Sequence, residues 1–448
     1  MNLFLDNHFD PKKPFNAEFG YVGLIGSWFN KGFLIGRYKR LTRLKSYENV
    51  LLSAPTGAGK TTRFLVKQLL SLKNSSFLIN DPQGELWQHC SGYLSRYAKV
   101  YSINFSNSGK SAGYNPFARL KKGNDVNKIA HLLISHTLDK GNGDVFWSLA
   151  STNLIATLIR LLLYQPKEFQ NLANLIRLVQ YFELSDKVDG WIAKTNDEKL
   201  ILDYKSIIST PEKTLQNVVA SVKAALQVFD DPEIARTTAF DTISFEALRE
   251  TPTVIFLHNS LGDSRYISIL NSIFFEQFYG FALETLPAKH DLSIYVILEE
   301  CAAMYIPMLA QATATCRKAR VGNFLTVQAH SQLKSFYKDQ TETIKSNCRT
   351  KIWLTGQTSL EELKEIETLA GKRIHKDHKG IERTVPLMSA DAIRMLPDSR
   401  SLILSGNTPL ILGKTSPYYR SLIFRRRASI PPLEFEKHIP DEPILMLK

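Results

Sequence analysis

One stretch, Ala54-Pro-Thr-Gly-Ala-Gly-Lys-Thr61, constrains the fold of this 448-residue chain more than any other. It follows a short apolar run at residues 49–54, which predicts a buried strand, and it precedes residues 62–70, whose apolar side chains have helical spacing. A strand, a glycine-rich loop and a helix in this order form a P-loop, which binds nucleotide phosphates. A chance glycine-rich turn is the alternative, but strand, loop and helix together favour the P-loop. Ala54 stands where the first glycine of the motif is usual.

The residue types of this loop suit the binding of a triphosphate. Glycines allow backbone conformations that turn successive N–H groups toward phosphate oxygens, and the following helix adds its positive end. Lys60 supplies a charge for the β- and γ-phosphates, and the Thr61 hydroxyl is a ligand for Mg²⁺. The predicted nucleotide-binding residues are Pro55, Thr56, Gly57, Ala58, Gly59, Lys60, Thr61 and Thr62.

A second informative stretch is the apolar run at residues 292–298, which ends in Glu299 and Glu300. A strand that ends in two acids is typical of a Walker B motif, in which the first acid holds the Mg²⁺ shell and the second orients or deprotonates the attacking water. The two carboxylates repel each other unless a cation or donor compensates, so a purely structural role would be costly. Glu299 stands where Asp is usual, and Glu300 is the stronger candidate for catalysis.

Three further polar residues occupy positions where a nucleotide site would use them. Gln328 ends an apolar strand predicted from residue 323 and is expected to sense the γ-phosphate. Arg317 lies near the end of a helix predicted over residues 302–319 and is expected to reach a neighbouring subunit's nucleotide as an arginine finger. Asp81 follows a strand predicted at residues 76–80, where it either acts near the nucleotide and Mg²⁺ or caps the next helix.

The pattern along the chain predicts an α/β fold with a mostly parallel central sheet and an inserted all-α domain. Strands and helices alternate over residues 49–105 and again from residue 253, whereas residues 126–240 show helical spacing and no confident strand. The predicted parts are a lead-in segment at 1–48, the nucleotide-binding domain at 49–125 and 246–420, the all-α domain at 126–245, and a C-terminal tail at 421–448.

Charge and composition narrow the class of partner. The formal net charge of +13 suggests a polyanionic partner, either nucleic acid or a membrane surface, with a merely soluble basic protein as the alternative. The four cysteines form no Cys-x-x-Cys pair and are interpreted as free thiols in a reducing compartment. No secretory signal is recognised, and the apolar stretches at 21–36 and 149–164 fall short of the roughly 20 apolar residues of a spanning helix.

Several sequence blocks occur in a characteristic order. They are Ala-Pro-Thr-Gly-Ala-Gly-Lys-Thr (54–61), Asn-Asp-Pro-Gln-Gly-Glu-Leu (80–86), Tyr-Asn-Pro-Phe (114–117), Phe-Trp-Ser-Leu-Ala (146–150), Ile-Leu-Glu-Glu (297–300), Ala-Thr-Cys-Arg-Lys-Ala-Arg-Val-Gly (314–322), Val-Gln-Ala-His-Ser-Gln-Leu (327–333) and Asn-Cys-Arg-Thr-Lys-Ile (347–352). This series, spread over residues 31–415, resembles the type IV coupling proteins, the TraG/TraD-like ATPases of conjugation and type IV secretion. A P-loop alone names only a superfamily, and the ordered series is more specific.

The resemblance implies more than the residue patterns show. It implies a RecA-like P-loop NTPase interrupted by an all-α domain, ATP and Mg²⁺ as cofactors, and a homo-hexameric ring that moves single- or double-stranded DNA. It also implies a relaxase or other secreted protein substrate and the components of a secretion channel as partners. The family's P-loop lysine falls on Lys60, its Walker B acids on Glu299 and Glu300, its arginine finger on Arg317 and its sensor glutamine on Gln328.

The chain departs from the family pattern at three points. Glu299 replaces the usual Asp, Gln83 replaces a usual Lys, and the membrane-spanning helices that begin most members are not recognised. The expected location is cytoplasmic, with association at the inner face of the cell membrane through partners left open. The expected function is an Mg²⁺-dependent ATPase motor for DNA or nucleoprotein substrates. The alternatives are a non-hydrolysing, nucleotide-gated docking platform for secreted substrates and a duplex-DNA translocase resembling FtsK.

Overall fold

A computed structural model describes residues 16–120, 123–138, 145–182, 185–258, 264–376, 378–434, 441 and 443–444. The chain divides into two compact units, each made of several segments. Unit 1 comprises Met1–Val100, Glu246–Val254 and Ala282–Leu433. Unit 2 comprises Tyr101–Phe245, Ile255–Phe281 and Glu434–Lys448. This division does not test the predicted domain boundaries at 125, 245 and 420, which remain predictions.

The strands form one large sheet and one small one. The large sheet has the order β11-β10-β7-β1-β6-β5-β2-β4-β3. Its strands, in chain order, are β1 (Val50–Ser53), β2 (Ser75–Asn80), β3 (Lys99–Asn104), β4 (Thr253–His258), β5 (Ser293–Leu298), β6 (Val321–Val327), β7 (Thr350–Leu354), β10 (Arg400–Ser405) and β11 (Ile411–Lys414). The small sheet pairs β8 (Lys372–Lys376) with β9 (Glu382–Pro386).

The predicted parallel sheet is confirmed at the centre of unit 1. β1 lies between β6 and β7 and is parallel to both, and β5 is parallel to β6 and β2. Every residue of β1, β2, β5 and β6 is buried, as expected for continuous apolar strands covered on both faces. Antiparallel pairing occurs at the edge, where β10 pairs with β7 and β11.

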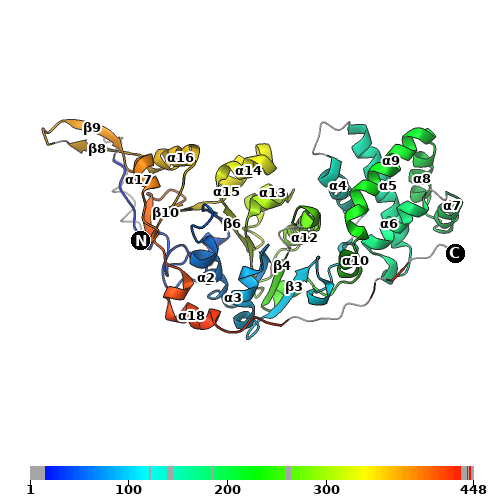
Figure 1. The fold of residues 1–448 in the computed structure, drawn as a ribbon, viewed down its shortest axis with the longest axis horizontal. Helices are drawn as coiled ribbons and strands as arrows, with labels where there is room; N and C mark the ends of the chain where they lie inside the picture. The colour runs from blue at the N-terminus through cyan, green and yellow to red at the C-terminus, as the bar shows by residue number, and fades with distance from the viewer. Residues whose placement is uncertain are drawn as a thin grey trace. The chain divides into compact units, whose positions relative to one another are not determined.

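Helices cover the two faces of this sheet because the chain crosses it in two directions. The connection from β1 to β2 contains α2 (Val66–Leu69), and it crosses the sheet in the direction opposite to the connections that contain α13 (Leu309–Thr315), α14 (His330–Tyr337) and α15 (Thr341–Asn347). Parallel crossovers are right-handed, so α2 covers one face and the other three helices cover the opposite face. Figure 1 shows α13–α15 grouped in yellow, apart from α2.

The remaining helices of unit 1 surround this core. α3 packs against both α2 and α18, and α16 packs against α17. Their bounds are α1 (Arg43–Ser46), α3 (Glu85–Leu94), α11 (Ala247–Glu250), α16 (Leu360–Ala370), α17 (Ala390–Arg394) and α18 (Leu422–Ala428).

Unit 2 is built largely from helices. They are α4 (Gly123–Leu138), α5 (Val145–Leu163), α6 (Leu172–Tyr181), α7 (Ser185–Lys194), α8 (Glu198–Ile208), α9 (Glu212–Leu226), α10 (Pro232–Ala239) and α12 (Ser264–Glu284). α5 is the one described helix that is long and apolar enough to cross a membrane, and half of its window Phe146–Leu163 is buried. It packs against α4, α6, α8 and α9, so it is a central helix of this bundle. The expectation that the stretch at 149–164 falls short of a spanning helix is wrong by length and composition.

One expectation about secondary structure is wrong. The helix predicted over residues 302–319 is a short 3-10 turn, Cys301–Ala303, followed by a break and the seven-residue α13. Pro307 explains the break, because proline disfavours a helical conformation at the preceding residue and cannot donate a backbone hydrogen bond. The tail predicted from residue 421 begins with α18, which contains the three arginines Arg425, Arg426 and Arg427.

The segments before and after the nucleotide-binding core are tied to the helix that follows the P-loop. The Gln68 side chain accepts a hydrogen bond from Leu34 N and donates one to Leu34 O, both at 2.8 Å. The buried Lys67 Nζ donates to the carbonyl oxygens of Arg37 at 2.9 Å and Ser416 at 3.2 Å. Burial, together with the nearby charge of Arg40, lowers the pKa of Lys67 to about 7. This helix therefore holds two segments, at Leu34–Arg37 and at Ser416, that are far apart in the sequence.

A substitution at Gly92 would test how the residues that follow α18 pack on α3. A Cβ atom at this position would lie 1.8 Å from the carbonyl oxygen of Pro431, although Gly-to-Ala changes within helices usually stabilise by about 0.5–1 kcal/mol. We expect Gly92→Ala to destabilise unit 1 by about 1–3 kcal/mol through this overlap. Calorimetric unfolding would measure the change. Gly280→Ala on α12, which meets no atom within 4 Å, is the matched control and should stabilise. Equal stabilisation by both changes would contradict the packing of Pro431 on α3.

Candidate nucleotide site

The predicted P-loop joins β1 to a helix at the carboxyl edge of the parallel strands. Gly57 and Gly59 have φ values of +82° and +81°, which are conformations that favour glycine. Ala54 has no positive φ and its N–H donates to Val327 O at 3.0 Å, so this position does not require glycine. Thr61–Leu65 form a π-helical turn that leads into α2. The loop thus has the backbone expected of a phosphate-binding turn.

Glu299 lies beside the P-loop threonine. Thr61 Oγ1 donates to Glu299 Oε1 at 2.7 Å, and Asn80 Nδ2 donates to the Glu299 carbonyl at 2.8 Å. The Glu299 side chain is buried, and burial raises the pKa of its carboxyl, while the Thr61 hydrogen bond and the Lys60 charge act in the opposite direction. The register of β2 beside β5, which pairs Asn80 with Leu298, brings these groups together.

One carboxylate oxygen of Glu300 contacts two of the other predicted residues. Its Oε1 forms an ion pair with Lys60 Nζ and accepts a hydrogen bond from Gln328 Nε2 at 3.0 Å. Burial lowers the pKa of Lys60, and the charge of Glu299 opposes this effect. The Glu300 backbone is left-handed, with φ of +56°, and its N–H donates to Thr326 Oγ1 at 3.1 Å. The structure therefore joins the P-loop, the end of β5 and the end of β6 at one carboxylate.

The oxygen atoms here fit a magnesium site. Thr61 Oγ1 and Glu299 Oε1 are adjacent, and Asn80 Oδ1 is buried without a hydrogen-bond partner although its amide nitrogen holds the Glu299 backbone. Mg²⁺ is usually held by one or two protein oxygens together with phosphates and water. Among the described residues no group of three His, Cys, Asp or Glu side chains could hold a metal.

Of the two roles predicted for Asp81, the structure shows the capping of the next helix. Its carboxylate accepts hydrogen bonds from Trp87 N at 2.7 Å and Leu86 N at 3.2 Å in the first turn of α3. Burial raises the pKa of Asp81 to about 7, these backbone hydrogen bonds oppose the rise, and the charge of Glu299 adds to it. Asp81 thus caps the first turn of α3.

Arg317 does not join this site within one chain. It precedes β6, at the amino edge of the parallel strands, whereas the P-loop lies at their carboxyl edge. A seven-residue strand such as β6 spans roughly 20 Å, so the two edges are far apart. The Arg317 side chain is 59% exposed and forms an ion pair with Glu48 at 3.0 Å, just before β1.

Three residues at the site were not identified from the sequence. Asn80 and Thr326 hold the backbone of the two Walker B acids, as described above. Gln332 exchanges two hydrogen bonds with Gln328, accepting from its N–H at 3.0 Å and donating to its Oε1 at 3.3 Å. The polar end of β2 was a usable signal for Asn80. The other two residues become recognisable only when the register of β5 beside β6 is known.

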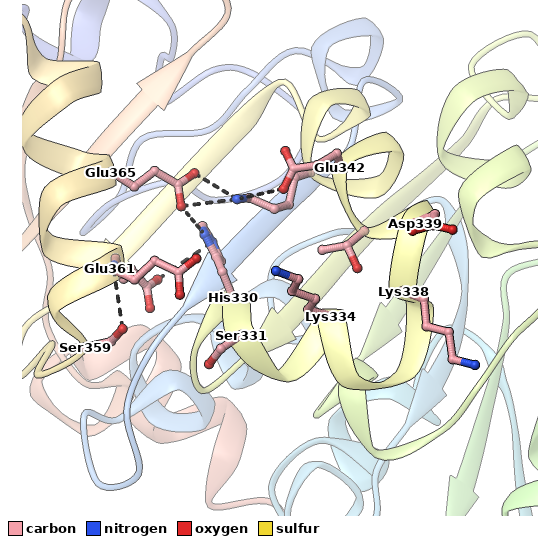
Figure 2. A pocket seen from close by; sticks show the side chains of 12 residues that line it. His330, Ser331, Lys334, Lys338, Asp339, Glu342, Ser359, Glu361 and Glu365 are labelled. Atoms are coloured by element: carbon pink, nitrogen blue, oxygen red, sulfur yellow. Dashed lines mark hydrogen bonds and ion pairs between the residues drawn. The ribbon is translucent and has the colours of Figure 1, made fainter. Parts of the chain in front are cut away.

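A second polar cluster lies beside the end of β1, the strand that precedes the P-loop. Ser53 Oγ, at the end of β1, donates to Glu362 Oε1 on α16. The His330 ring lies 3.7 Å from the same Glu362 oxygen and 3.0 Å from Glu365 Oε2, and Lys345 Nζ lies 3.1 Å from Glu365 Oε1. Figure 2 shows His330 and Glu365 directed toward one another at the side of a cavity of about 330 Å³. The cluster links the end of β1 and the start of α14 to α15 and α16.

Comparison with known proteins agrees with this geometry. The family model described as type IV secretory system conjugative DNA transfer matches residues 20–439. The chain belongs to this family. Its membership makes it a coupling protein of conjugation or type IV secretion, with the P-loop ATPase fold of these motors.

The individual relatives have low sequence identity to this chain. The chain is 23% identical over 470 residues to a conjugal transfer protein TraG of Escherichia coli, and the match covers 91% of this chain and 72% of that protein. The conjugative coupling protein TrwBdeltaN70 has a TM-score of 0.72 at 16% identity, covering 89% of this chain and 93% of that one. VirB4 of Thermoanaerobacter pseudethanolicus has a TM-score of 0.57 at 14% identity, with 88% and 98% covered. These solved structures share the fold of this chain.

The His330 cluster gives a pH-dependent prediction. Burial would raise the pKa of Glu365, but hydrogen bonds and charges from His330 and Lys345 outweigh it and hold the pKa at about 2. Because this pKa is depressed on folding, the stabilisation is present above about pH 4.3 and is lost as the pH falls toward 2. Glu365→Gln should therefore cost about 1–3 kcal/mol at pH 7 and progressively less below pH 4. Calorimetric unfolding at a series of pH values measures this.

Glu361→Gln on the same helix is the control for this prediction. The Glu361 side chain is exposed, so its substitution should change stability by less than about 0.5 kcal/mol at every pH. A cost for Glu365→Gln that stays the same at pH 7 and pH 3 would contradict the assigned ion pairs.

Proposed function

We propose that this coupling protein hydrolyses ATP with Mg²⁺ and uses the energy to move DNA or a nucleoprotein substrate. The observation that carries the proposal is the meeting of Lys60, Glu300 and Gln328 on one carboxylate, with Thr61 and Glu299 beside it. Family membership supports the transport role. Structures of TrwB in complex with ADP and Mg²⁺, and with a non-hydrolysable ATP analogue, support the choice of cofactors.

The roles of the residues follow from their positions. The P-loop from Pro55 to Thr62 would hold the phosphates through its backbone N–H groups, while Thr61, Glu299 and Asn80 would surround the Mg²⁺ site. Bound Mg²⁺ would supply neutralisation of phosphate charge. Lys60 compensates the charge of Glu300 in the observed contact, and a phosphate that draws Lys60 away would leave Glu300 able to accept a proton from water. Gln328 would connect that change to β6, because it binds Glu300 directly.

Substitution of Glu300 and Lys60 tests the ATPase role. Glu300→Gln keeps the size of the side chain but cannot accept a proton, so turnover should fall roughly 10²–10⁴-fold while nucleotide binding persists. Lys60→Ala should weaken nucleotide binding as well. Hydrolysis is measured with and without single-stranded and duplex DNA, and DNA should raise turnover of the unaltered protein. Glu361→Gln is the matched carboxylate control and should retain the unaltered rate.

Two results would contradict this function. If DNA neither binds nor changes turnover at moderate salt, the chain does not act as a DNA motor. If nucleotide binds but turnover is negligible, and Glu300→Gln changes nothing, the chain acts as a nucleotide-gated docking platform. A strict preference for duplex DNA would instead favour a translocase resembling FtsK.

We further propose that Arg317 completes the nucleotide site of a neighbouring subunit in a homo-hexameric ring. Its place at the sheet edge opposite its own P-loop supports a role between subunits, and its exposed guanidinium is accessible apart from the Glu48 contact. The same ring would receive a relaxase or other secreted protein and deliver it to components of the secretion channel. We place the protein in the cytoplasm, held at the inner face of the membrane through these partners.

Mixing two inactive variants tests the role of Arg317. Arg317→Ala and Lys60→Ala should each lose hydrolysis, since an arginine finger contributes roughly 10³–10⁵ in rate. A mixture should recover part of the activity, because an intact Arg317 from one variant meets an intact Lys60 from the other. Lys318→Ala, an exposed neighbour, should stay active. No recovery at any mixing ratio would place the function of Arg317 within its own chain.

A further inference from the structure

Two stretches of unit 1 carry positive charge and no carboxylate. Residues 19–47 contain no Asp or Glu, and residues 399–433 contain none either, although the whole chain has 43 of them. Each stretch instead carries six lysines or arginines. Stretches with one sign of charge and no compensating acid are typical of surfaces that meet a polyanion.

The fold brings these two stretches together at the helix that follows the P-loop (Figure 1). Lys67 Nζ, on α2, donates to Arg37 O in the first stretch and to Ser416 O in the second. The same nitrogen lies 5.9 Å from the centre of the Tyr38 ring and 5.7 Å from the centre of the Phe424 ring on α18. The two stretches therefore form neighbouring parts of the surface of unit 1.

The first stretch exposes two large apolar side chains on a loop that is held in place. Phe29 is 91% exposed and Trp28 is 54% exposed. Ser27 and Arg40 exchange two backbone hydrogen bonds of 3.0 Å across the loop, and the Trp28 ring lies 4.9 Å from the Tyr38 ring. Contact of large apolar side chains with water is unfavourable, so this fixed pair indicates a surface that another molecule covers.

The second stretch shows the same combination on α18. Leu422 and Ile423 are 66% and 59% exposed, whereas Phe424 is buried. Because successive residues of a helix are about 100° apart, Arg425 and Arg426 fall on the same exposed side as the two aliphatic residues. An arginine in this position can lay its apolar stem along the neighbouring side chains and keep its guanidinium in the polar layer.

The cations beside these apolar side chains have no acidic partners. In the part of the chain that the structure describes, Lys39, Arg425 and Arg426 form no ion pair. The Arg37 side chain lies against the Tyr38 ring, with 5.2 Å between the guanidinium carbon and the ring centre. These four side chains therefore remain available for an external anion.

Two acids lie at the border of this region. Asp291 lines the same cavity as Lys31, and Glu85 on α3 lies near Tyr418, where it raises the pKa of the phenol. The proposal therefore does not depend on Lys31 or on Tyr418.

We propose that unit 1 binds an anionic lipid bilayer directly through a membrane-contact surface, whose apolar members are Trp28, Phe29, Leu422 and Ile423. These side chains would enter the interfacial layer of the bilayer, and the four unpaired cations would meet the lipid phosphates. The inference goes beyond the proposed function, in which partner proteins hold the coupling protein at the membrane.

The exposed aliphatic side chains favour a bilayer over nucleic acid. Proteins that bind single strands combine cations with aromatic rings on which the bases stack. Leu422 and Ile423 offer no ring, and contact with phosphates leaves their apolar surface unsatisfied. The interfacial layer of a bilayer accepts aliphatic and aromatic side chains together with cations, so it matches both parts of this surface.

Two double variants of the full-length chain test the proposal by sedimentation with vesicles of phosphatidylcholine, with and without phosphatidylglycerol. Phe29→Ser with Ile423→Ser removes apolar contacts from both parts of the surface, and Arg425→Gln with Arg426→Gln removes two charges. Each variant should bind vesicles that contain phosphatidylglycerol about 10-fold more weakly than the unaltered protein. The difference made by the arginine variant should shrink at high salt, because salt screens exposed charges.

A matched control removes apolar side chains elsewhere in unit 1. Leu360 and Met395 are 72% and 73% exposed, so Leu360→Ser with Met395→Ser removes similar exposed surface and should bind vesicles like the unaltered protein. The depth of contact is measured with brominated phosphatidylglycerol, which quenches tryptophans that enter the bilayer. It should quench the unaltered protein clearly and a Trp28→Phe variant much less.

The outcomes separate this proposal from the proposed function. If the unaltered protein does not bind the phosphatidylglycerol vesicles, or if the apolar variant binds them equally well, the proposal is wrong, while the hydrolysis and DNA measurements still decide the proposed function. If the arginine variant loses binding to DNA oligonucleotides while its vesicle binding is unchanged, the surface belongs to nucleic acid instead. Hydrolysis without vesicles or DNA should be the same in all these proteins.

Discussion

Two neighbouring carboxylates at the end of a buried strand set the strongest constraint in this protein. Glu299 and Glu300 follow β5, all of whose residues are buried, and their repulsion must be offset by charges and donors from elsewhere in the chain. Thr61 and Lys60 provide this from the P-loop, and Gln328 provides it from the end of β6. The same contacts that offset this repulsion therefore bring the P-loop and the end of β6 to one place, so the local stability of the fold depends on the residues proposed for catalysis.

The left-handed backbone at Glu300 belongs to this arrangement. A residue other than glycine in this conformation costs about 1–3 kcal/mol and persists only where its surroundings hold it. Thr326 holds it by accepting the Glu300 N–H, and the turn directs the second acid toward Lys60 while the first faces Thr61. The two acids thus differ in surroundings, which suits one to a metal and the other to a proton. Arg317 lies outside this centre, at the opposite edge of the parallel strands.

Local patterns predicted the elements whose chemistry is contained in consecutive residues. The P-loop, the apolar strands, the paired acids and the central helix α5 were all recognisable, because their spacing alone defines them. Asn80, Thr326 and the contact of Ser53 with Glu362 were not, since each depends on which strand or helix lies beside another far along the chain. The helix expected over residues 302–319 was overestimated because its apolar pattern hid the break at Pro307. The short helix α18 was not identified within the predicted tail.

The clasp around the P-loop helix has a consequence for how force is carried. Gln68 and Lys67 form hydrogen bonds with the backbone at Leu34, Arg37 and Ser416. A small rotation of the helix would therefore displace both of these backbone segments. These bonds join main-chain atoms rather than mobile side chains at the receiving end, which makes the linkage stiff. A displacement of the helix that follows the P-loop would therefore be transmitted directly to the two outer segments.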